Sequence, residues 1–313
     1  MSTQEDTKNK YGWKRDLHDV RDKKLTFKPY QYSQNKSMVD LRNRMPEVYN
    51  QGNIGSCTAN AICSAFEFDQ MDQGLPSFSP SRLFLYYNER LKEGTESIDS
   101  GASIRDGIKS INKQGICSEA EWPYQVNYFT TCPYKKCYTD AKFHKCLKYK
   151  RMDNSNIKDL KHCLSVGKPF VFGFSVYSSF ENPMIWNPKV DSMPMPNPNK
   201  EKLLGGHAVM AVGYSDKRKC FIIRNSWGKD WGLDGYFFMP YQFITSNQCD
   251  DFWVVQTVVD SDKYVSKLSI ERESYSNVVK NKKSTSDDED KEKTIMIPLK
   301  EKSPDKQNCH IMD

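Results

Sequence analysis

The sequence has no hydrophobic run that approaches the roughly 18 apolar residues of a membrane span. Its first ten residues lack the apolar core of a secretory signal peptide, and Cys309 lies one residue too far from the end for a prenylation box. Internal repeats are also absent. These absences argue against a membrane protein, a membrane partner and a repeat array.

A dense basic domain is missing too. The 46 Lys and Arg residues exceed the 40 Asp and Glu residues by six. Nine basic and five acidic residues give residues 1–38 a net charge of +4, whereas ten of each cancel in residues 264–313. The remaining 27 basic and 25 acidic residues leave only +2 for residues 39–263. Nucleic-acid-binding domains usually carry a basic face and a pI above about 9, so nucleic acid is not an expected partner.

The 313 residues suffice for two lobes with flanking segments. Residues 1–38 form a polar arm with spaced aromatic residues, and residues 39–148 show helical periodicity. Residues 149–263 contain short apolar runs typical of strands, and the charge-rich residues 264–313 are predicted to be disordered. A helical lobe followed by a strand-rich lobe predicts an α+β fold, with a cleft between the lobes as the natural place for chemistry.

Local periodicity places the expected elements within those lobes. Apolar residues recur at helical spacing near residues 59–66 and 104–111, and residues 82–91 are rich in leucine and aromatic residues, which predicts helices. Continuous apolar runs predict strands at residues 169–176, 208–214, 220–224, 235–239 and 252–255.

The motif Gln-Gly-Asn-Ile-Gly-Ser-Cys at residues 51–57 places a cysteine at the start of an expected amphipathic helix. Unpaired N–H groups and a partial positive charge at a helix N-terminus stabilise a thiolate. Cys57 is therefore a candidate nucleophile. The alternative is a buried and inert cysteine, which is the commoner role of a single cysteine in this position.

A nucleophilic cysteine needs a base and a group that orients the base. His207 follows two glycines at the start of an apolar run, and Asn225 follows another apolar run directly. Each residue taken alone is more often structural, the histidine as a core residue and the asparagine as a turn former. Their occurrence with Cys57 in three separate motifs favours a shared site.

These motifs resemble the papain-like cysteine peptidases over roughly residues 39–259. The resemblance rests on the motif at 51–57, on Gly-His-Ala-Val at 206–209, and on Asn-Ser-Trp-Gly at 225–228, in that order. The separation of 150 residues between Cys57 and His207 also fits this family. The resemblance implies a papain-like two-lobe fold, with an N-terminal helical lobe, a C-terminal β-barrel-like lobe and the active-site cleft between them.

The resemblance also implies roles for individual residues. Cys57 would attack the scissile carbonyl, His207 would exchange the proton, and Asn225 would hold the imidazole. The side-chain amide of Gln51 would stabilise the oxyanion together with the backbone N–H of Cys57. Three further positions, Gly101, Gly206 and Trp227, are assigned to substrate binding, and the tryptophan would also shield the His–Asn hydrogen bond from water.

Two departures stand beside the nucleophile, where Ile54 and Thr58 replace a customary cysteine and tryptophan. Neither removes a catalytic group. The sequence therefore predicts a cysteine endopeptidase that acts on polypeptides through a thioester acyl-enzyme, since no insertion between Cys57 and Trp122 is long enough for the occluding loop of carboxydipeptidases. The alternative is a catalytically silent relative that binds peptides in the same cleft.

No cofactor and no metal are expected. Cys132, Cys137, His144 and Cys146 offer zinc-ligand chemistry, but their spacing matches no standard pair-plus-pair site, so a local disulfide or free thiols are favoured. The missing bridge cysteines and signal peptide favour a cytoplasmic or virion-associated location. The 35 Lys against 11 Arg and the 20 Asn resemble the composition of relatives from large DNA viruses and protists.

The N-terminal arm is too short for the helical prodomain of this family. Its aromatic residues between Tyr11 and Tyr32 suggest a short inhibitory propeptide that lies across the cleft. A simple tether packed on the outer surface is the alternative.

Overall fold

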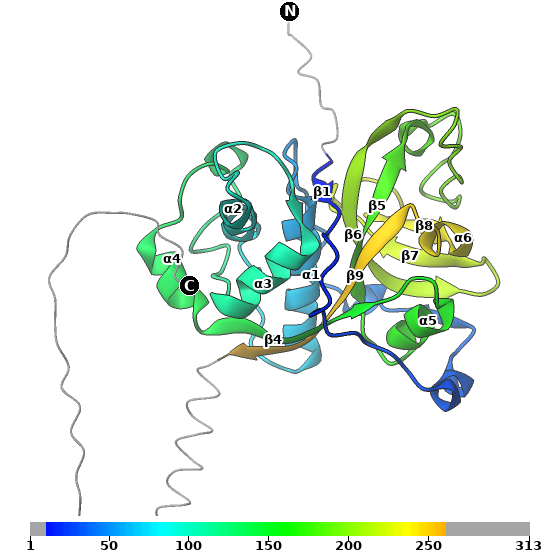
Figure 1. Ribbon diagram of the computed structural model, residues 1–313, viewed down its shortest axis with the longest axis horizontal. Coiled ribbons are helices and arrows are strands. Elements are labelled where there is room, and N and C mark those ends of the chain that lie inside the picture. Colours follow the sequence, from blue (N-terminus) through cyan, green and yellow to red (C-terminus); the bar gives the residue numbers. More distant parts are fainter. Residues whose placement is uncertain (1–10, 261–313) are drawn as a thin grey trace, which may run out of the picture. The chain divides into compact units, whose positions relative to one another are not determined.

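The computed structural model describes residues 11–260 (Figure 1). The first ten residues of the arm and the tail at 264–313, for which disorder was predicted, lie outside the described residues.

Four helices form the helical part of the fold. They are α1 (Cys57–Asp72), α2 (Arg82–Glu93), α3 (Ile104–Lys113) and α4 (Lys135–Ala141). Serine side chains cap two of them, because Ser81 accepts from the backbone N–H of Phe84 and Ser103 accepts from that of Asp106. Gly94 ends α2 in the left-handed conformation, with φ of 69°.

The strand-rich part is a seven-stranded antiparallel sheet with the order β4-β9-β5-β6-β7-β8, and β2 pairs with β6. Within residues 11–260 this path does not close on itself. Its strands are β2 (Met38–Asp40), β4 (His144–Met152), β5 (Phe170–Tyr177), β6 (Leu203–Ser215), β7 (Cys220–Arg224), β8 (Tyr236–Pro240) and β9 (Cys249–Asp260). Helices α5 (Ile157–Ser165) and α6 (Tyr241–Ile244) accompany the sheet, and the 3-10 turns are η1 (Pro29–Gln34), η2 (Arg42–Arg44), η3 (Val126–Tyr128) and η4 (Ser178–Glu181).

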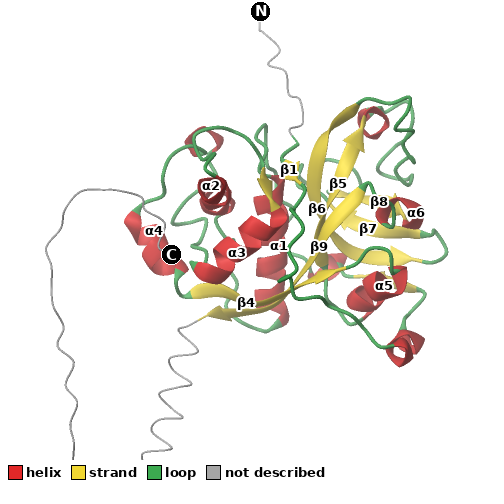
Figure 2. Ribbon diagram, in the orientation of Figure 1, coloured by secondary structure: helices red, strands yellow, loops and turns green. Residues whose placement is uncertain are grey.

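Helix α1 lies between the other helices and the sheet (Figure 2). Every residue from Cys57 to Gln70 is buried, so the helix is not the amphipathic helix that the sequence suggested. It packs against α2 and α3 on one side and against β6 and β9 on the other, which leaves no face for water. The first turn of α1, with Cys57, therefore lies where the helical and strand-rich parts meet.

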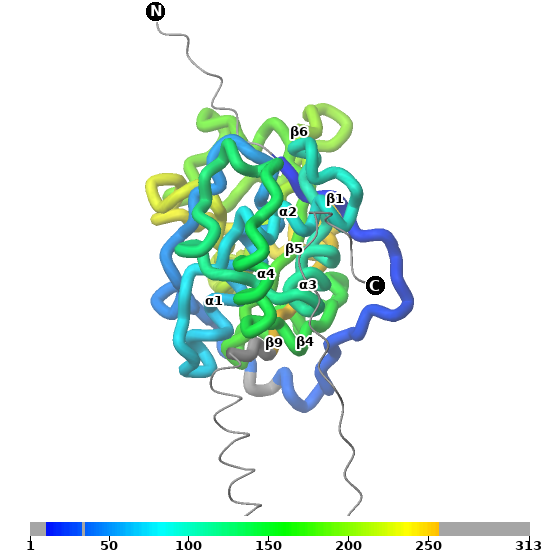
Figure 3. The backbone as a smooth tube through the Cα atoms, turned by 90° about the vertical axis from the view of Figure 1, so that its left-hand side faces the viewer, coloured from blue at the N-terminus to red at the C-terminus, as the bar shows by residue number. Residues whose placement is uncertain are grey.

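The N-terminal arm is an ordered part of the fold from residue 11 onward. Its short strand β1 (Trp13–Lys14) pairs in parallel with β3 (Ala102–Ser103). Beyond β1 the arm curves along the outside of the fold (Figure 3), where Leu17 and Val20 are 85% and 88% exposed. It then joins β4 through backbone hydrogen bonds that link Arg151 with Lys23 and Leu25. No helix in the described part of the chain is both long and apolar enough to cross a lipid bilayer.

Candidate active site

The predicted base and its orienting residue are in direct contact. His207 lies in β6, Asn225 follows the last residue of β7, and the imidazole Nε2 is 2.8 Å from the side-chain Oδ1 of Asn225. That oxygen also accepts the backbone N–H of Ser226 at 2.8 Å, which fixes the orientation of the amide. Because the oxygen accepts, Nε2 carries the imidazole proton and Nδ1 carries the lone pair.

Cys57 is the first residue of α1, and its thiol is fully buried. The backbone N–H groups of Ala208, Gly12 and Thr58 donate toward the sulfur. Since Ala208 directly follows His207, the sulfur lies against the strand that carries the predicted base. The Nδ1 atom of His207 is buried and has no hydrogen-bond partner among residues 11–260.

Burial controls the charge of both residues. It raises the pKa of the Cys57 thiol to about 11, even though the three backbone N–H groups act in the opposite direction. Burial also lowers the pKa of His207 to about 4, against the hydrogen bond that its Nε2–H donates to Asn225, which raises it. Thiol and imidazole are therefore both neutral at pH 7 in the arrangement described.

Gln51 ties the nucleophile loop to the residue after Asn225. Its side-chain Nε2 donates to the carbonyl oxygen of Ile54 at 2.9 Å, and its Oε1 accepts from the hydroxyl of Ser226 at 2.7 Å. The backbone N–H of Gln51 also donates to the carbonyl of Ser226 at 2.8 Å. These bonds hold the loop that precedes Cys57 against the strand-rich part.

An aromatic cluster covers the imidazole. The Trp227 ring stacks on His207, with 5.0 Å between ring centroids and 30° between planes. Tyr11 from the arm meets both rings edge-on, at 5.8 Å from His207 and 6.1 Å from Trp227. The hydroxyl of Tyr11 donates to the carboxylate of Glu181.

Glycines line the path of residues 11–13, which we name the glycine track. Gly55 and Gly101 belong to the helical part of the fold, whereas Gly173, Gly205 and Gly206 lie on β5 and β6. A Cβ atom at any of the last four would come within 2.7 Å of an arm atom. The backbone of the arm therefore comes closer than any side chain at these positions would permit.

Contacts of Gly12 fix the position of the arm along the glycine track. The backbone N–H of Ala102 donates to the carbonyl of Gly12 at 2.8 Å, and a Cβ atom on Gly12 would lie 1.7 Å from the carbonyl oxygen of Gly55. All three residues assigned to substrate binding, Gly101, Gly206 and Trp227, contact arm residues. The structure thus brings these three positions together along one path.

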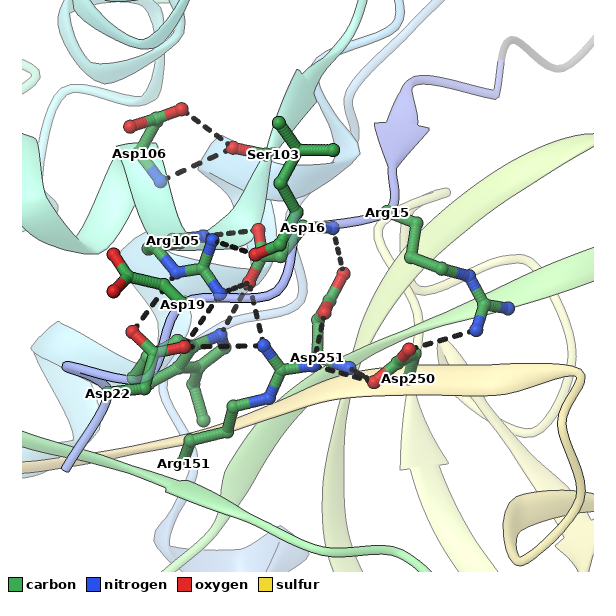
Figure 4. Close-up of polar contacts among 12 residues, drawn as sticks. Arg15, Asp16, Asp19, Asp22, Ser103, Arg105, Asp106, Arg151, Asp250 and Asp251 are labelled. Atoms are coloured by element: carbon green, nitrogen blue, oxygen red, sulfur yellow. Dashed lines mark hydrogen bonds and ion pairs between the residues drawn. The ribbon is translucent and has the colours of Figure 1, made fainter. Parts of the chain in front are cut away.

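A buried charged network fixes the arm beyond the track (Figure 4). The Asp16 carboxylate accepts from the backbone N–H of Arg105 at 3.1 Å and from Nε1 of Trp253 at 3.0 Å. The backbone N–H of Asp16 donates to Oδ2 of Asp251 at 2.7 Å, and Arg151 donates to the other oxygen of Asp251 at 2.9 Å. Burial raises the pKa of Asp16. Sequence reasoning missed this network, because its members come from four distant segments.

Glu89 is a second missed residue. It is fully buried in α2, and its Oε2 accepts from the hydroxyl of Thr58, the residue after the nucleophile, at 2.8 Å. Burial raises the pKa of Glu89 well above its usual range. The helical pattern of α2 gave no signal for a buried acid.

The described residues hold no group of three or more His, Cys, Asp or Glu side chains suited to a metal ion. Cys137, one of the zinc candidates, is a buried free thiol that interacts with the thiol of Cys117. A disulfide between Cys132 and Cys137 is therefore not formed.

Comparisons with known proteins identify the family of the chain. A sequence model of the papain family cysteine proteases matches residues 35–251. An uncharacterized peptidase C1-like protein of Acanthamoeba polyphaga mimivirus is 43% identical over 234 residues, which cover 72% of this chain and 74% of the viral protein. A cathepsin B-like protein of Giardia intestinalis is 31% identical and shares 62% of this chain and 64% of its own length.

Solved structures give the same fold. Xylellain, a cysteine protease from Xylella fastidiosa, superposes with a TM-score of 0.75 and 43% identity, covering 82% of this chain and 99% of xylellain. Procathepsin B from Trypanosoma congolense superposes with a TM-score of 0.62 at 18% identity, covering 78% and 85% of the two chains, which supports the fold alone. The predicted α+β, papain-like fold is thereby confirmed. The chain belongs to the papain family of cysteine proteases.

Proposed function

We propose that the chain is a cysteine endopeptidase that hydrolyses peptide bonds through a thioester on Cys57. The observation that carries this proposal is the oriented imidazole of His207. Its Nε2 is held by Asn225 at 2.8 Å, and its Nδ1 is a buried lone pair without a partner beside the strand that the Cys57 sulfur contacts. An oriented base next to a thiol is the arrangement that nucleophilic catalysis requires.

The chemistry proceeds in two balanced steps. In the first, Nδ1 of His207 takes the thiol proton, the sulfur of Cys57 bonds to the substrate carbonyl carbon, and the proton passes to the amine as the C–N bond breaks. In the second, His207 takes a proton from water, the water oxygen bonds to the acyl carbon, and the carboxylic acid leaves as the C–S bond breaks and the proton returns to the sulfur of Cys57. The backbone N–H of Cys57 and the side-chain amide of Gln51 are the proposed donors to the oxyanion, a contribution typically worth about 10²–10³ in rate.

The local architecture supports the proposal that the enzyme cleaves within chains rather than from an end. The segment between Cys57 and Trp122 contains α1, α2, β3 and α3 with their short connections. It leaves no long insertion beside the glycine track that would block one end of a bound peptide.

The arm is proposed to hold this enzyme in a latent state. Residues 11–13 fill the glycine track, and both Cys57 and His207 are fully buried beneath them. The same burial keeps the thiol and the imidazole neutral, whereas the reactive form is the thiolate. Departure of the arm would admit water and favour the thiolate–imidazolium pair.

A cut in the arm after folding tests both parts of the proposal. The turn around Val20 is exposed, so the recognition site of a sequence-specific protease can be inserted there in the full chain. The nicked protein is then separated from the released fragment and treated with an epoxide-bearing peptide analogue, and adducts are mapped by mass spectrometry. We expect an adduct on Cys57 only after the cut, together with hydrolysis of an unstructured protein substrate.

The matched controls are the same chain before cutting and a nicked chain with C57S. A nicked, folded protein that has lost its fragment and forms no adduct on Cys57 would overturn the peptidase proposal in favour of a silent peptide-binding protein. Equal labelling of Cys57 before and after the cut would support the peptidase proposal but contradict the proposal that the arm holds the enzyme latent.

A further inference from the structure

The side chain of Trp13 occupies a pocket next to the catalytic residues. The indole is 8% exposed, and its Nε1 donates to Oδ2 of Asp251 at 3.0 Å. Two glycines of the track make room for the ring, because a Cβ atom on Gly173 would lie 1.9 Å from the indole and one on Gly206 would lie 2.8 Å from it. Gly206 directly precedes the proposed base, so this pocket opens one residue from the site of reaction.

We propose that this Trp13 pocket receives a side chain of the substrate, and that it selects large aromatic side chains that carry a neutral hydrogen-bond donor, above all tryptophan. The proposal rests on the proposed peptidase function and adds a substrate class to it. Asp251 is then a specificity-determining residue, and Trp13 occupies the place of the substrate side chain while the arm is docked.

Oδ2 of Asp251 needs a hydrogen-bond donor from whatever fills the pocket. Its side chain is fully buried, and its Oδ2 takes the indole N–H and the backbone N–H of Asp16, both from the arm. When the arm leaves, that oxygen loses both donors at once. A ligand that fills the pocket displaces water and buries this acceptor again, so a ligand that restores one N–H bond gains over a ligand of equal shape that cannot.

The second oxygen of Asp251 explains why the donor is neutral. Oδ1 accepts from Nη2 of Arg151 at 2.9 Å, and this guanidinium also bonds Asp250 at 2.7 Å. Arg151 belongs to β4 and not to the arm. A lysine or arginine side chain entering the pocket would approach an existing guanidinium, whereas an indole adds no charge.

The preference for a flat ring follows from the strands themselves. Gly173 on β5 pairs with Ala208 on β6, two residues beyond Gly206, so the two glycines open adjacent positions of the sheet. The indole of Trp13 lies against backbone at both, a surface that suits a planar ring better than a branched side chain.

The test uses the nicked full chain and peptides that differ in one side chain. Quenched fluorescent peptides carry tryptophan, benzothienylalanine, phenylalanine, leucine or arginine at each of the three positions before the cleaved bond. Benzothienylalanine has the shape of tryptophan but a sulfur in place of the N–H. At one position we expect kcat/KM for tryptophan to exceed that for benzothienylalanine about tenfold, and arginine to be the poorest.

Variants of Asp251 separate the hydrogen bond from the shape of the pocket. Asp251 has φ of 58°, so glycine is the replacement that tolerates its backbone. D251G should bring the ratio of tryptophan to benzothienylalanine close to one, while both stay ahead of leucine. G173A should reduce the preference for tryptophan over leucine, because its methyl group enters the space of the ring.

Binding measurements keep the test informative if the chain proves not to be a peptidase. Synthetic peptides of residues 11–20, with tryptophan or benzothienylalanine at position 13, are titrated against the nicked protein after removal of its fragment. Tighter binding of the tryptophan peptide by about tenfold supports the pocket whatever the catalytic outcome. Equal affinities, equal kcat/KM values, or a preference for arginine over tryptophan would overturn the proposal.

Discussion

Replacing Gly12 by alanine should release the arm from the glycine track. The new Cβ atom would lie 1.7 Å from the carbonyl oxygen of Gly55, whereas carbon and oxygen atoms approach to about 3.3 Å. The arm backbone would have to move by roughly 1.6 Å to restore that separation. It has no room on its other side, because the Gly12 carbonyl already lies against Gly101 and is bonded to the N–H of Ala102.

The magnitude follows from the contacts that such a shift breaks. The hydrogen bond between Ala102 and Gly12 is 2.8 Å long and contributes about 1 kcal/mol. The bond from Trp13 to the side chain of Asp251 is 3.0 Å long and, at pH 8, where this carboxyl group with a pKa of about 7 is mostly ionised, contributes about 2 kcal/mol. A loss of about 3 kcal/mol corresponds to roughly a hundredfold increase in the population with an undocked arm.

The assay is the rate of alkylation of Cys57 by the epoxide analogue in the uncut chain, followed by peptide mapping. We expect G12A to react about a hundred times faster than the native chain. L17A is the matched control, because Leu17 lies in the same arm with 85% of its surface exposed, and its reactivity should stay native. If G12A has the melting temperature of the native chain and its Cys57 still reacts at the native rate, the arm does not hold the enzyme latent.

Three further outcomes are expected. Burial and the charge of Asp16 raise the pKa of Asp251 to about 7 in the docked state, so docking of the arm takes up a proton. The arm fragment should therefore bind up to about tenfold more weakly per pH unit as pH rises from about 4 to 7. D251N should flatten this dependence in a binding titration, since Arg151 and the carboxylate of Asp250 are not part of the arm. Glu89 has a raised pKa, so its stabilising neutral form is lost as pH rises, and the melting temperature of E89Q should fall less between pH 6 and pH 9 than that of the native chain. N225A should lower kcat/KM of the nicked enzyme by about 10- to 100-fold with little change in melting temperature, because the imidazole loses the acceptor that orients it, and native activity of N225A would contradict that role.

Periodicity was enough to locate the elements whose own residues are apolar. Strand β7 spans the predicted residues 220–224, and helix α3 covers the isoleucine repeat at 104–111. Strand β4 was not predicted, because its sequence is His-Lys-Cys-Leu-Lys-Tyr-Lys-Arg-Met and carries no apolar alternation. It is a strand because β9 pairs with it from residue 252 to residue 260, so tertiary pairing overrides local preference.

The residues of the candidate site likewise fall into those that the sequence could locate and those that it could not. The motifs around Cys57, His207 and Asn225 could be found because each is a short, contiguous pattern. The partners of the arm could not, since the Trp13–Asp251 bond joins residues 238 positions apart. The aromatic spacing predicted that residues from Tyr11 to Tyr32 cross the cleft, but only the first few lie on the glycine track, and the hydroxyl of Tyr32 instead bonds Asp159 at 2.6 Å beside α5.

The register of the arm would also protect the arm from cleavage by the enzyme that it is proposed to inhibit. Hydrolysis requires a carbonyl carbon in front of the Cys57 sulfur, with its oxygen directed at the oxyanion donors. Gly12 instead directs its N–H toward the sulfur, and its carbonyl oxygen is taken by the N–H of Ala102. The peptide nearest the nucleophile therefore offers a donor where a substrate offers an electrophile. If the arm holds the enzyme latent as proposed, resistance to self-cleavage follows from the same two contacts, and a change that moves Gly12 should alter both together.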